Sequence, residues 1–368
     1  MKISDLANTH ILKQPVYKPG KPIEQVALEY GLKTKEVCKL ASNENPLGPS
    51  ANAIAAAEEA LEKVRLYPEG RGIALRKSIA LKRGFTPEQI VLGNGSNEII
   101  ELLGHVFLRP GDEILTGEFT FVVYKLVAQL FGAKAVEVPM PKMIHDLDAM
   151  TAAVTDRTRI VFLPSPNNPT GTVNTNEQIH EFARCLPSHI VFCFDEAYAE
   201  YLEDPPDLRP LIDEGRNVIC LRTFSKIYGL AGLRIGYGYS SKEFSDLLHR
   251  SRQPFNTNAV AQAAALAALE DDGWTNHCRE SNAAGLCQLQ QGFEMLGLEF
   301  IPSQANFVLV KVGNAEKVFT EMQKRGVIAR PFGNDLSSYL RVTVGTEKEN
   351  VLALAALEKT LVTLPSSP

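Results

Sequence analysis

Little in this sequence points to a metal, a membrane or a nucleic acid. The six cysteines include no CxxC pair and lie mostly in apolar stretches, which favours free thiols in a reducing compartment. The net charge is −5 and no basic cluster stands out, which argues against nucleic acid as a partner. The longest nearly apolar stretch, Ala259 to Leu269, is too short to cross a bilayer. Because the first residues also lack the pattern of a secretory signal, we expect a cytoplasmic protein without a membrane partner.

The pattern of the 368 residues predicts two domains and an α/β fold. The first 40 or so residues are rich in proline and are expected to be irregular. From Ile90 to Tyr239, short apolar runs typical of strands alternate with helical stretches, which predicts a mostly parallel central sheet sandwiched by helices. A helical block and a mixed tail follow and predict a smaller α+β domain. We therefore expect an N-terminal segment (1–45) that joins the small domain and dimer contacts, a large domain (46–255) and a small C-terminal domain (256–368).

Several polar groups follow predicted strands, where open α/β sheets place their ligands. They are the glycine-rich turn Gly93–Glu98, the loop Ser165–Gly171 with two prolines around Asn167-Asn168, Asp195 at the end of an apolar run, and Thr223–Lys226 with Arg234. Each group alone could be an ordinary turn, a helix cap or a solvated lysine. The spacing GxGxxG is absent, which argues against a dinucleotide site.

Together these groups supply the parts of a pyridoxal-phosphate site. An amine can form an imine with the cofactor, an acid can face its pyridine nitrogen, and hydroxyls with an arginine can hold its phosphate. A helix that begins directly after the glycine-rich turn would add backbone N–H groups for the phosphate. The joint occurrence in chain order, each group at a predicted strand end, favours this site over the separate explanations.

The motifs SPNNPTG, DEAY, TFSK and GLRIGY resemble those of the fold-type-I pyridoxal-phosphate-dependent aminotransferases of class I/II, and the resemblance covers essentially the whole chain. The segments Pro15–Pro22, Ser42–Pro49, Tyr67-Pro68 and Leu340–Gly345 are similar to the histidinol-phosphate aminotransferase branch. The resemblance implies fold type I and pyridoxal 5′-phosphate as the cofactor.

The resemblance also assigns catalytic and cofactor-binding roles. Lys226 would bind the cofactor covalently and move a proton at the substrate Cα, while Asp195 would pair with the pyridine nitrogen. Asn168 and Tyr198 would contact the 3′-oxygen of the cofactor. Phe121 would stack on the ring, at a position where relatives often have tyrosine. The phosphate ligands implied are Gly95, Ser96, Asn97, Thr223, Ser225, Arg234 and, from the partner subunit of a homodimer with shared active sites, the equivalent of Tyr67.

On the substrate side the resemblance implies Tyr17, Asn43, Arg330 and Arg341, with Arg341 binding a carboxylate. The expected reaction converts histidinol phosphate and 2-oxoglutarate into imidazole acetol phosphate and glutamate in histidine biosynthesis, in two half-reactions through pyridoxamine phosphate. The partners are thus a small amino donor and a 2-oxo acid. An aromatic amino-acid aminotransferase and a lyase similar to threonine-phosphate decarboxylase remain open as alternatives. A non-enzymatic regulator would need an attached DNA-binding module, of which the sequence shows no sign.

Overall fold

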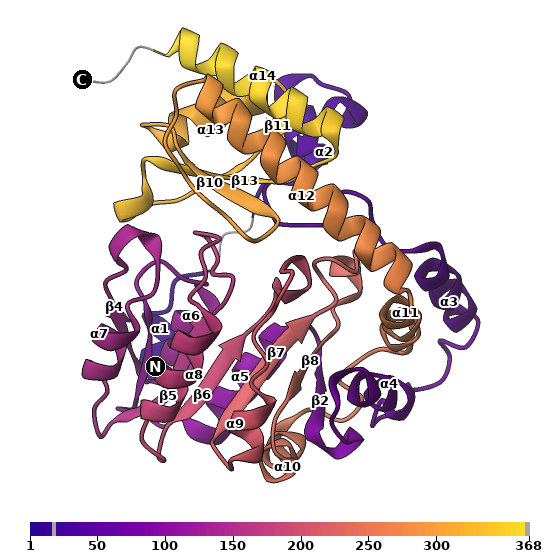
Figure 1. Cartoon of the computed structure of the whole chain (residues 1–368), viewed down its shortest axis with the longest axis vertical. Coiled ribbons are helices and arrows are strands. Elements are labelled where there is room, and N and C mark those ends of the chain that lie inside the picture. The colour runs from indigo at the N-terminus through magenta and orange to yellow at the C-terminus, as the bar shows by residue number, and fades with distance from the viewer. Residues whose placement is uncertain (17–19, 365–368) are drawn as a thin grey trace.

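A seven-stranded sheet forms the centre of the larger part of the molecule in the computed structural model, which describes residues 1–16 and 20–364 (Figure 1). Its strands are, in spatial order, β2 (Ile90–Gly93), β8 (Gly236–Tyr239), β7 (Val218–Thr223), β6 (Val191–Asp195), β5 (Thr158–Pro164), β3 (Glu113–Gly117) and β4 (Lys134–Val138). β8 runs antiparallel to its neighbours β7 and β2, whereas β3 to β7 pair in parallel. The predicted mostly parallel α/β sheet is confirmed.

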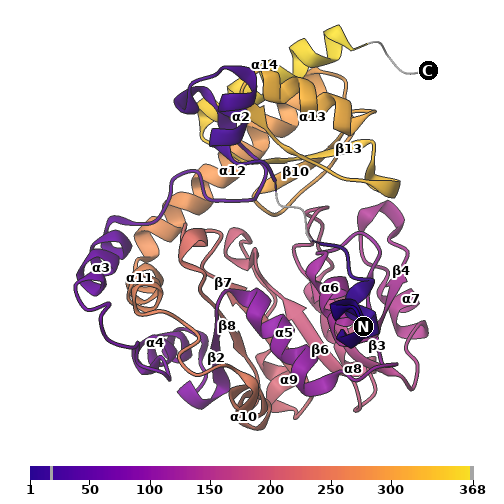
Figure 2. The ribbon, with the colours of Figure 1, turned by 180° about the vertical axis from the view of Figure 1, so that it is seen from behind.

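Two apolar clusters cover the two faces of this sheet, which explains why its strands are apolar without alternation. Along β6, Val191 and Cys193 pack into one cluster, while Phe192 and Phe194 pack into the other. On the first face lie α5 (Ser96–Phe107), α6 (Val123–Leu130) and α10 (Lys242–Ser251), and on the second lie α4 (Ile73–Arg83), α7 (Leu147–Ala152), α8 (Asn176–Cys185) and α9 (Arg209–Asp213). The short α1 (Thr9–Leu12) lies against α6 near the N-terminus (Figure 2).

The smaller part contains an antiparallel sheet with helices on one side. The strand order is β12 (Arg330–Pro331), β13 (Tyr339–Thr343), β10 (Phe307–Lys311) and β9 (Phe300–Ile301), and the helices are α12 (Asp272–Met295), α13 (Ala315–Lys324) and α14 (Glu347–Thr363). A two-stranded parallel ladder joins β1 (Cys38–Lys39) to β11 (Val327–Ile328), so the N-terminal segment is built into this part.

The expectation of an irregular first segment was wrong for α2 (Ile23–Tyr30), which packs Val26 and Ala27 against Ile328. Pro22 directly precedes this helix, and proline is tolerated at a helix start because the first N–H groups have no partner within the helix. The prolines therefore lead into a helix rather than excluding one.

The long helix α12 connects the two parts (Figure 1). Before it, α11 (Ala259–Glu270) packs against α3 (Ala51–Leu61) and α4 within the large core. Within α12, Cys278 belongs to the large core and Leu289 to the small one. We therefore propose a domain boundary inside α12 instead of the one expected at residue 256.

Short 3-10 turns complete the described chain: η1 (Ile3–Leu6), η2 (Thr34–Glu36), η3 (Pro87–Gln89), η4 (Pro141–Met143), η5 (Ala199–Tyr201), η6 (Ala231–Leu233) and η7 (Asn334–Leu336). In the described ranges, 1–16 and 20–364, none of the helices combines the length and the apolarity needed to cross a membrane.

Candidate active site

A cavity of about 950 Å³ opens where the parallel strands end, between the large sheet and the strands β12 and β13 of the small one. The residues expected from the sequence that line it are Asn43, Ser96, Asn97, Phe121, Asn168, Asp195, Tyr198, Thr223, Ser225, Lys226, Arg234, Arg330 and Arg341. Gly95 lies directly beside it, Tyr67 is 82% exposed and does not line it, and Tyr17 falls outside the described residues. Among the described residues no group of histidine, cysteine and acidic side chains could hold a metal ion.

Asp195 ends β6 as a buried carboxylate at the floor of the cavity. The hydroxyl of Tyr124 donates a hydrogen bond to its Oδ2 at 2.7 Å, and the backbone N–H of Ala197 donates to Oδ1 at 3.2 Å. Burial raises the pKa of Asp195 to about 6, although both hydrogen bonds and the charge of Lys226 act in the opposite direction, and the neighbouring Glu196 adds to the rise. A positive charge on a bound ring would offset the cost of this buried anion.

Tyr124 was missed by the sequence analysis. It lies in the first turn of α6, three residues after Phe121, and the two rings meet edge to face at 5.7 Å between centroids. Phe121 lies two residues before α6, so the available signal was only a tyrosine close in sequence to the expected stacking residue.

The raised pKa of Asp195 predicts how the cofactor-free protein responds to pH. Because the folded pKa lies near 6 and the ordinary value is 3.8, the stability that the protonated carboxyl contributes is present below about 4 and is lost as pH rises through about 6. A cofactor with a protonated ring nitrogen selects the ionised form, so its affinity should rise over the same interval.

Titration of cofactor-free protein with the cofactor at a series of pH values measures this midpoint. We expect Tyr124→Phe to move the midpoint upward, because it removes a hydrogen bond that favours the carboxylate. Asp195→Asn should abolish it. A midpoint near 6 that persists in Asp195→Asn would assign the transition to another group.

Lys226 follows β7, and its side chain lines the cavity. Its Nζ donates to the backbone oxygen of Ser42 at 3.3 Å and lies 5.5 Å from the ring centroid of Tyr198. The alternation of β7 places Thr223 on the cavity side, where its hydroxyl oxygen accepts the N–H of Ser225 at 3.1 Å. A primary amine therefore faces the same space as the buried carboxylate.

The start of α5 forms a cradle for an anion. Gly95 precedes the helix with φ of 76°, and a Cβ there would come within 2.6 Å of Nη2 of Arg234. Nη1 of Arg234 donates to the Ser225 hydroxyl oxygen at 3.2 Å, which leaves the Ser225 hydrogen available for a ligand. Free N–H groups at a helix start, a hydroxyl and a guanidinium fit the phosphate group of the expected cofactor.

The loop after β5 carries Asn168, which also lines the cavity. Asn167 holds this loop, since its amide donates to the Phe119 oxygen and to the Thr170 hydroxyl, both at 2.8 Å. The peptide bonds Ser165-Pro166 and Asn168-Pro169 are both cis. The amide oxygen of Asn168 accepts a hydrogen bond from Arg341, so residues of the two parts of the molecule meet over the cavity.

Arg330 and Arg341 form a pair of cations on the small sheet. They are direct partners in the antiparallel register of β12 and β13, which places both side chains on one face. Arg341 also donates to the Ala41 oxygen at 2.7 Å and lies between the rings of Phe307 and Phe332, 5.2 and 5.8 Å from their centroids. No described residue accepts a hydrogen bond from Arg330. Because like charges opposite each other repel, this pair favours anionic ligands.

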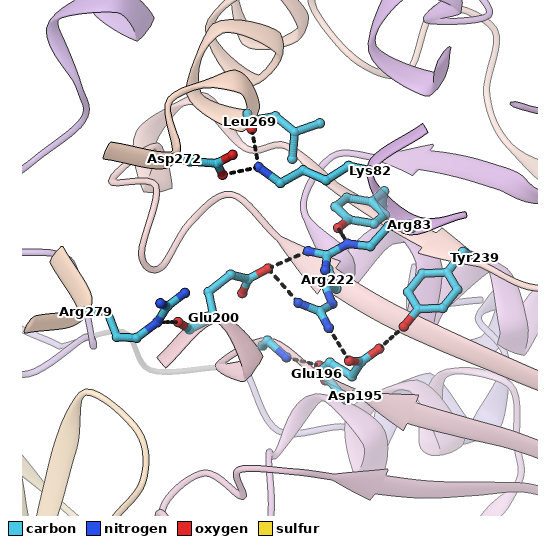
Figure 3. A network of polar contacts seen from close by, with 12 residues as sticks. Lys82, Arg83, Asp195, Glu196, Glu200, Arg222, Tyr239, Leu269, Asp272 and Arg279 are labelled. Carbon is cyan, nitrogen blue, oxygen red and sulfur yellow. Dashed lines mark hydrogen bonds and ion pairs between the residues drawn. The ribbon is translucent and has the colours of Figure 1, made fainter. Parts of the chain in front are cut away.

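On the other face of the sheet, directly behind Asp195, lies a buried ionic network (Figure 3). Arg222 donates to Glu196 at 2.6 Å and to Glu200 at 2.9 Å, and Arg83 donates to Glu200 at 3.2 Å. The Tyr239 hydroxyl donates to Glu196. The described guanidinium and carboxylate charges balance, as buried ions require. The alternation of β6 explains why Asp195 faces the cavity and Glu196 faces the network.

Comparisons with known proteins point in the same direction as this geometry. Residues 35–357 match the family model of the aminotransferases of class I and II. The chain is 46% identical to the histidinol-phosphate aminotransferase of Akkermansia muciniphila, over 98% of this chain and 100% of that protein, and 46% identical to that of Methylobacillus flagellatus, over 98% and 99%. A crystal structure of histidinol-phosphate aminotransferase from Sinorhizobium meliloti in complex with pyridoxal-5′-phosphate superposes with a TM-score of 0.90 at 28% identity, covering 97% of this chain and 98% of that one.

Proposed function

This chain belongs to the aminotransferase class I and II family, and from that premise we propose that it transfers the amino group of histidinol phosphate to 2-oxoglutarate with pyridoxal phosphate as its cofactor. The products are imidazole acetol phosphate and glutamate, in a cytoplasmic step of histidine biosynthesis. The observation that carries the proposal is that Lys226, Asp195 and the anion cradle at the start of α5 all line one cavity. Relatives named histidinol-phosphate aminotransferase, at 46% identity over nearly the whole chain, support the choice of substrate.

The protein groups have separable tasks in this proposal. When bound, pyridoxal phosphate supplies an electron-poor ring that stabilises negative charge at the substrate Cα. Lys226 binds the cofactor and carries the proton to and from that carbon, while the carboxylate of Asp195 keeps the ring nitrogen protonated. Tyr124 holds Asp195 in place through its hydrogen bond.

The other contacts orient the cofactor. Ser225, Arg234 and the N–H groups of Ser96 and Asn97, next to Gly95, hold the phosphate, and Thr223 supports Ser225. Phe121 would stack on the ring, and Asn168 and Tyr198 would contact the 3′-oxygen. These contacts would hold the cofactor in one orientation in the cavity.

The two arginines account for the charges of both substrates. Arg341, fixed by Asn168, Ala41 and two aromatic rings, binds the carboxylate of glutamate or 2-oxoglutarate. Arg330, from which no described residue accepts a hydrogen bond, binds the phosphate of histidinol phosphate. Tyr17 is proposed to line the same side but lies outside the described residues.

Turnover of histidinol phosphate, phenylalanine and threonine phosphate by one preparation tests the proposed substrate. We expect histidinol phosphate to have the highest kcat/KM. Arg330→Ala should lower kcat/KM roughly tenfold or more for histidinol phosphate, because a charge-assisted hydrogen bond is worth about 1.5–3 kcal/mol, and should change phenylalanine turnover little. Faster turnover of phenylalanine would favour an aromatic aminotransferase, and carbon dioxide released from threonine phosphate would favour a lyase.

We also propose a homodimer in which Tyr67 reaches the cofactor phosphate of the partner subunit. Tyr67 is 82% exposed, lies outside the cavity of its own chain and stacks on Phe255 at 4.8 Å between ring centroids. Large apolar side chains are exposed in the segment that precedes it, namely Leu61, Val64 and Leu66. Such a patch is typical of a protein interface. Mixing variants of Lys226 and Tyr67 tests the sharing, because only a hybrid dimer would contain an intact site.

A further inference from the structure

We propose that Asn43 is a positioning residue that directs the hydroxyl hydrogen of Tyr198 into the cavity, toward the 3′-oxygen of the cofactor. This inference rests on the proposed place of Tyr198 beside that oxygen. The side-chain amide of Asn43 donates to the Tyr198 hydroxyl oxygen at 2.9 Å, and both side chains are buried. A tyrosine hydroxyl has one hydrogen, and with Asn43 as its donor that hydrogen is left for an acceptor in the cavity.

Thr343 fixes which end of the Asn43 amide faces Tyr198. The backbone N–H of Asn43 donates to the Thr343 hydroxyl oxygen at 3.0 Å, and that hydroxyl donates to the side-chain oxygen of Asn43 at 3.1 Å. Turning the amide round would leave the hydrogen of the buried Thr343 hydroxyl without an acceptor among the described residues, which costs about 1–3 kcal/mol. The NH₂ end therefore points at Tyr198.

The backbone at Asn43 is also specific to this residue type. Its φ is 56°, in the left-handed region where asparagine is among the few tolerated residues besides glycine. The side chain of Asn306 donates to its backbone oxygen at 3.0 Å. The orientation of the amide thus depends on asparagine, while the backbone conformation is one that only a few residue types adopt.

The contact crosses between the two parts of the molecule. Thr343 ends β13 and Asn306 directly precedes β10, both in the small sheet, whereas Tyr198 follows β6 of the large one. The Asn43–Tyr198 hydrogen bond consequently exists only while the small sheet lies over the cavity as described. Asn43 links the position of the small domain to the hydrogen-bonding state of a residue at the cofactor.

A hydrogen bond donated to the 3′-oxygen stabilises negative charge on that oxygen. The oxygen then stabilises a proton on the nitrogen that joins Lys226 to the cofactor less strongly. Loss of that donor should therefore raise the pH at which the visible absorbance of the bound cofactor titrates. An aspartate at position 43 would accept from Tyr198 instead of donating and would turn the hydrogen away from the cofactor.

The test is a pH titration of the visible absorbance of the holoenzyme, a readout independent of turnover. We expect Asn43→Asp to raise the midpoint by about one pH unit, equivalent to one ordinary hydrogen bond, and Asn43→Gly, which keeps the left-handed backbone, to raise it less. In a Tyr198→Phe background, Asn43→Gly should cause no further shift, and Asn43→Asp should cause a smaller shift than in the wild type, because only the direct effect of its added negative charge remains. Asn45→Ala is the matched control, because Asn45 lies in the same segment as Asn43 but its amide donates to the Ile227 oxygen at 2.7 Å and not to Tyr198. The midpoint of this variant should be that of the wild type.

Three results would overturn the inference, and each points to a different failure. If Tyr198→Phe raises the midpoint and both Asn43 variants keep the wild-type value, the role of Asn43 fails while the proposed function stands. If Tyr198→Phe itself has no effect, the assignment of Tyr198 to the 3′-oxygen fails and the inference falls with it. A shift in Asn45→Ala equal to that of Asn43→Asp would show a general structural effect and would also overturn it.

Discussion

Replacement of Lys226 by alanine is expected to reduce transamination by at least a thousandfold and to abolish the visible absorbance that depends on covalent attachment of the cofactor to the protein. The amine lines the same cavity as Asp195, and no other described lysine except Lys125 lines it. Removing a general base that also binds the cofactor takes away both proton transfer at Cα and covalent attachment. Absorbance spectra and turnover with glutamate and 2-oxoglutarate measure the two effects.

Lys125→Ala provides the control for this experiment. Lys125 lines the same cavity but forms an ion pair with Glu137, and its side chain is about one-third exposed at 32%. We expect this variant to keep the absorbance and most of the activity. Full turnover in Lys226→Ala, or an equal loss in the two variants, would contradict the role of Lys226.

The Lys226→Ala subunit also tests the shared active site. Mixed with a Tyr67→Ala protein under conditions that exchange subunits, it forms hybrid dimers in which one site has both Lys226 and Tyr67. If neither parent is active, random exchange should restore about a quarter of wild-type activity, since half of the dimers are hybrids with one intact site of two. Activity that stays at the level of the parents would contradict a site completed by the partner subunit.

Replacement of Arg222 by methionine is expected to lower the free energy of unfolding by about 3–5 kcal/mol, the typical cost of removing one member of a buried ion pair. Arg222 is 3% exposed and donates to both Glu196 and Glu200, which are buried as well. Methionine fills a similar volume but leaves two carboxylates in the protein interior with a reduced positive charge. Urea unfolding of the cofactor-free protein measures the change.

Arg184→Met is the matched control, because Arg184 pairs with Glu214 at 2.8 Å while its side chain is 48% exposed. Solvent screens an exposed pair so that it contributes little to stability, and this variant should therefore unfold close to the wild type. Equal destabilisation of the two variants would show that the buried network contributes no more to the free energy of unfolding than an exposed ion pair does. Because Arg222 does not line the cavity, a folded Arg222→Met protein should still bind the cofactor.

Much of the large domain could be predicted from local patterns. The apolar runs before Ser165, Asp195 and Thr223 became β5, β6 and β7, because strands covered on both faces need apolar residues at every position. The helical stretch expected between the first two of these runs is α8 (Asn176–Cys185). The α2 helix escaped prediction because eight residues with two buried side chains give only a weak period against a proline-rich background.

The sequence alone determined which chemical groups meet. Lys226, Asp195, Asn168 and the α5 turn each follow a strand, and the parallel sheet brings the ends of such strands to one edge. The sequence could not show the partners that come from distant segments. Tyr124 on Asp195, Asn43 on Tyr198 and Arg341 on Asn168 join residues separated by 71, 155 and 173 positions. Such contacts depend on how helices and domains pack, and no local pattern records that packing. The tertiary structure therefore decided which proton, charge and hydrogen bond each of these groups presents to the cavity.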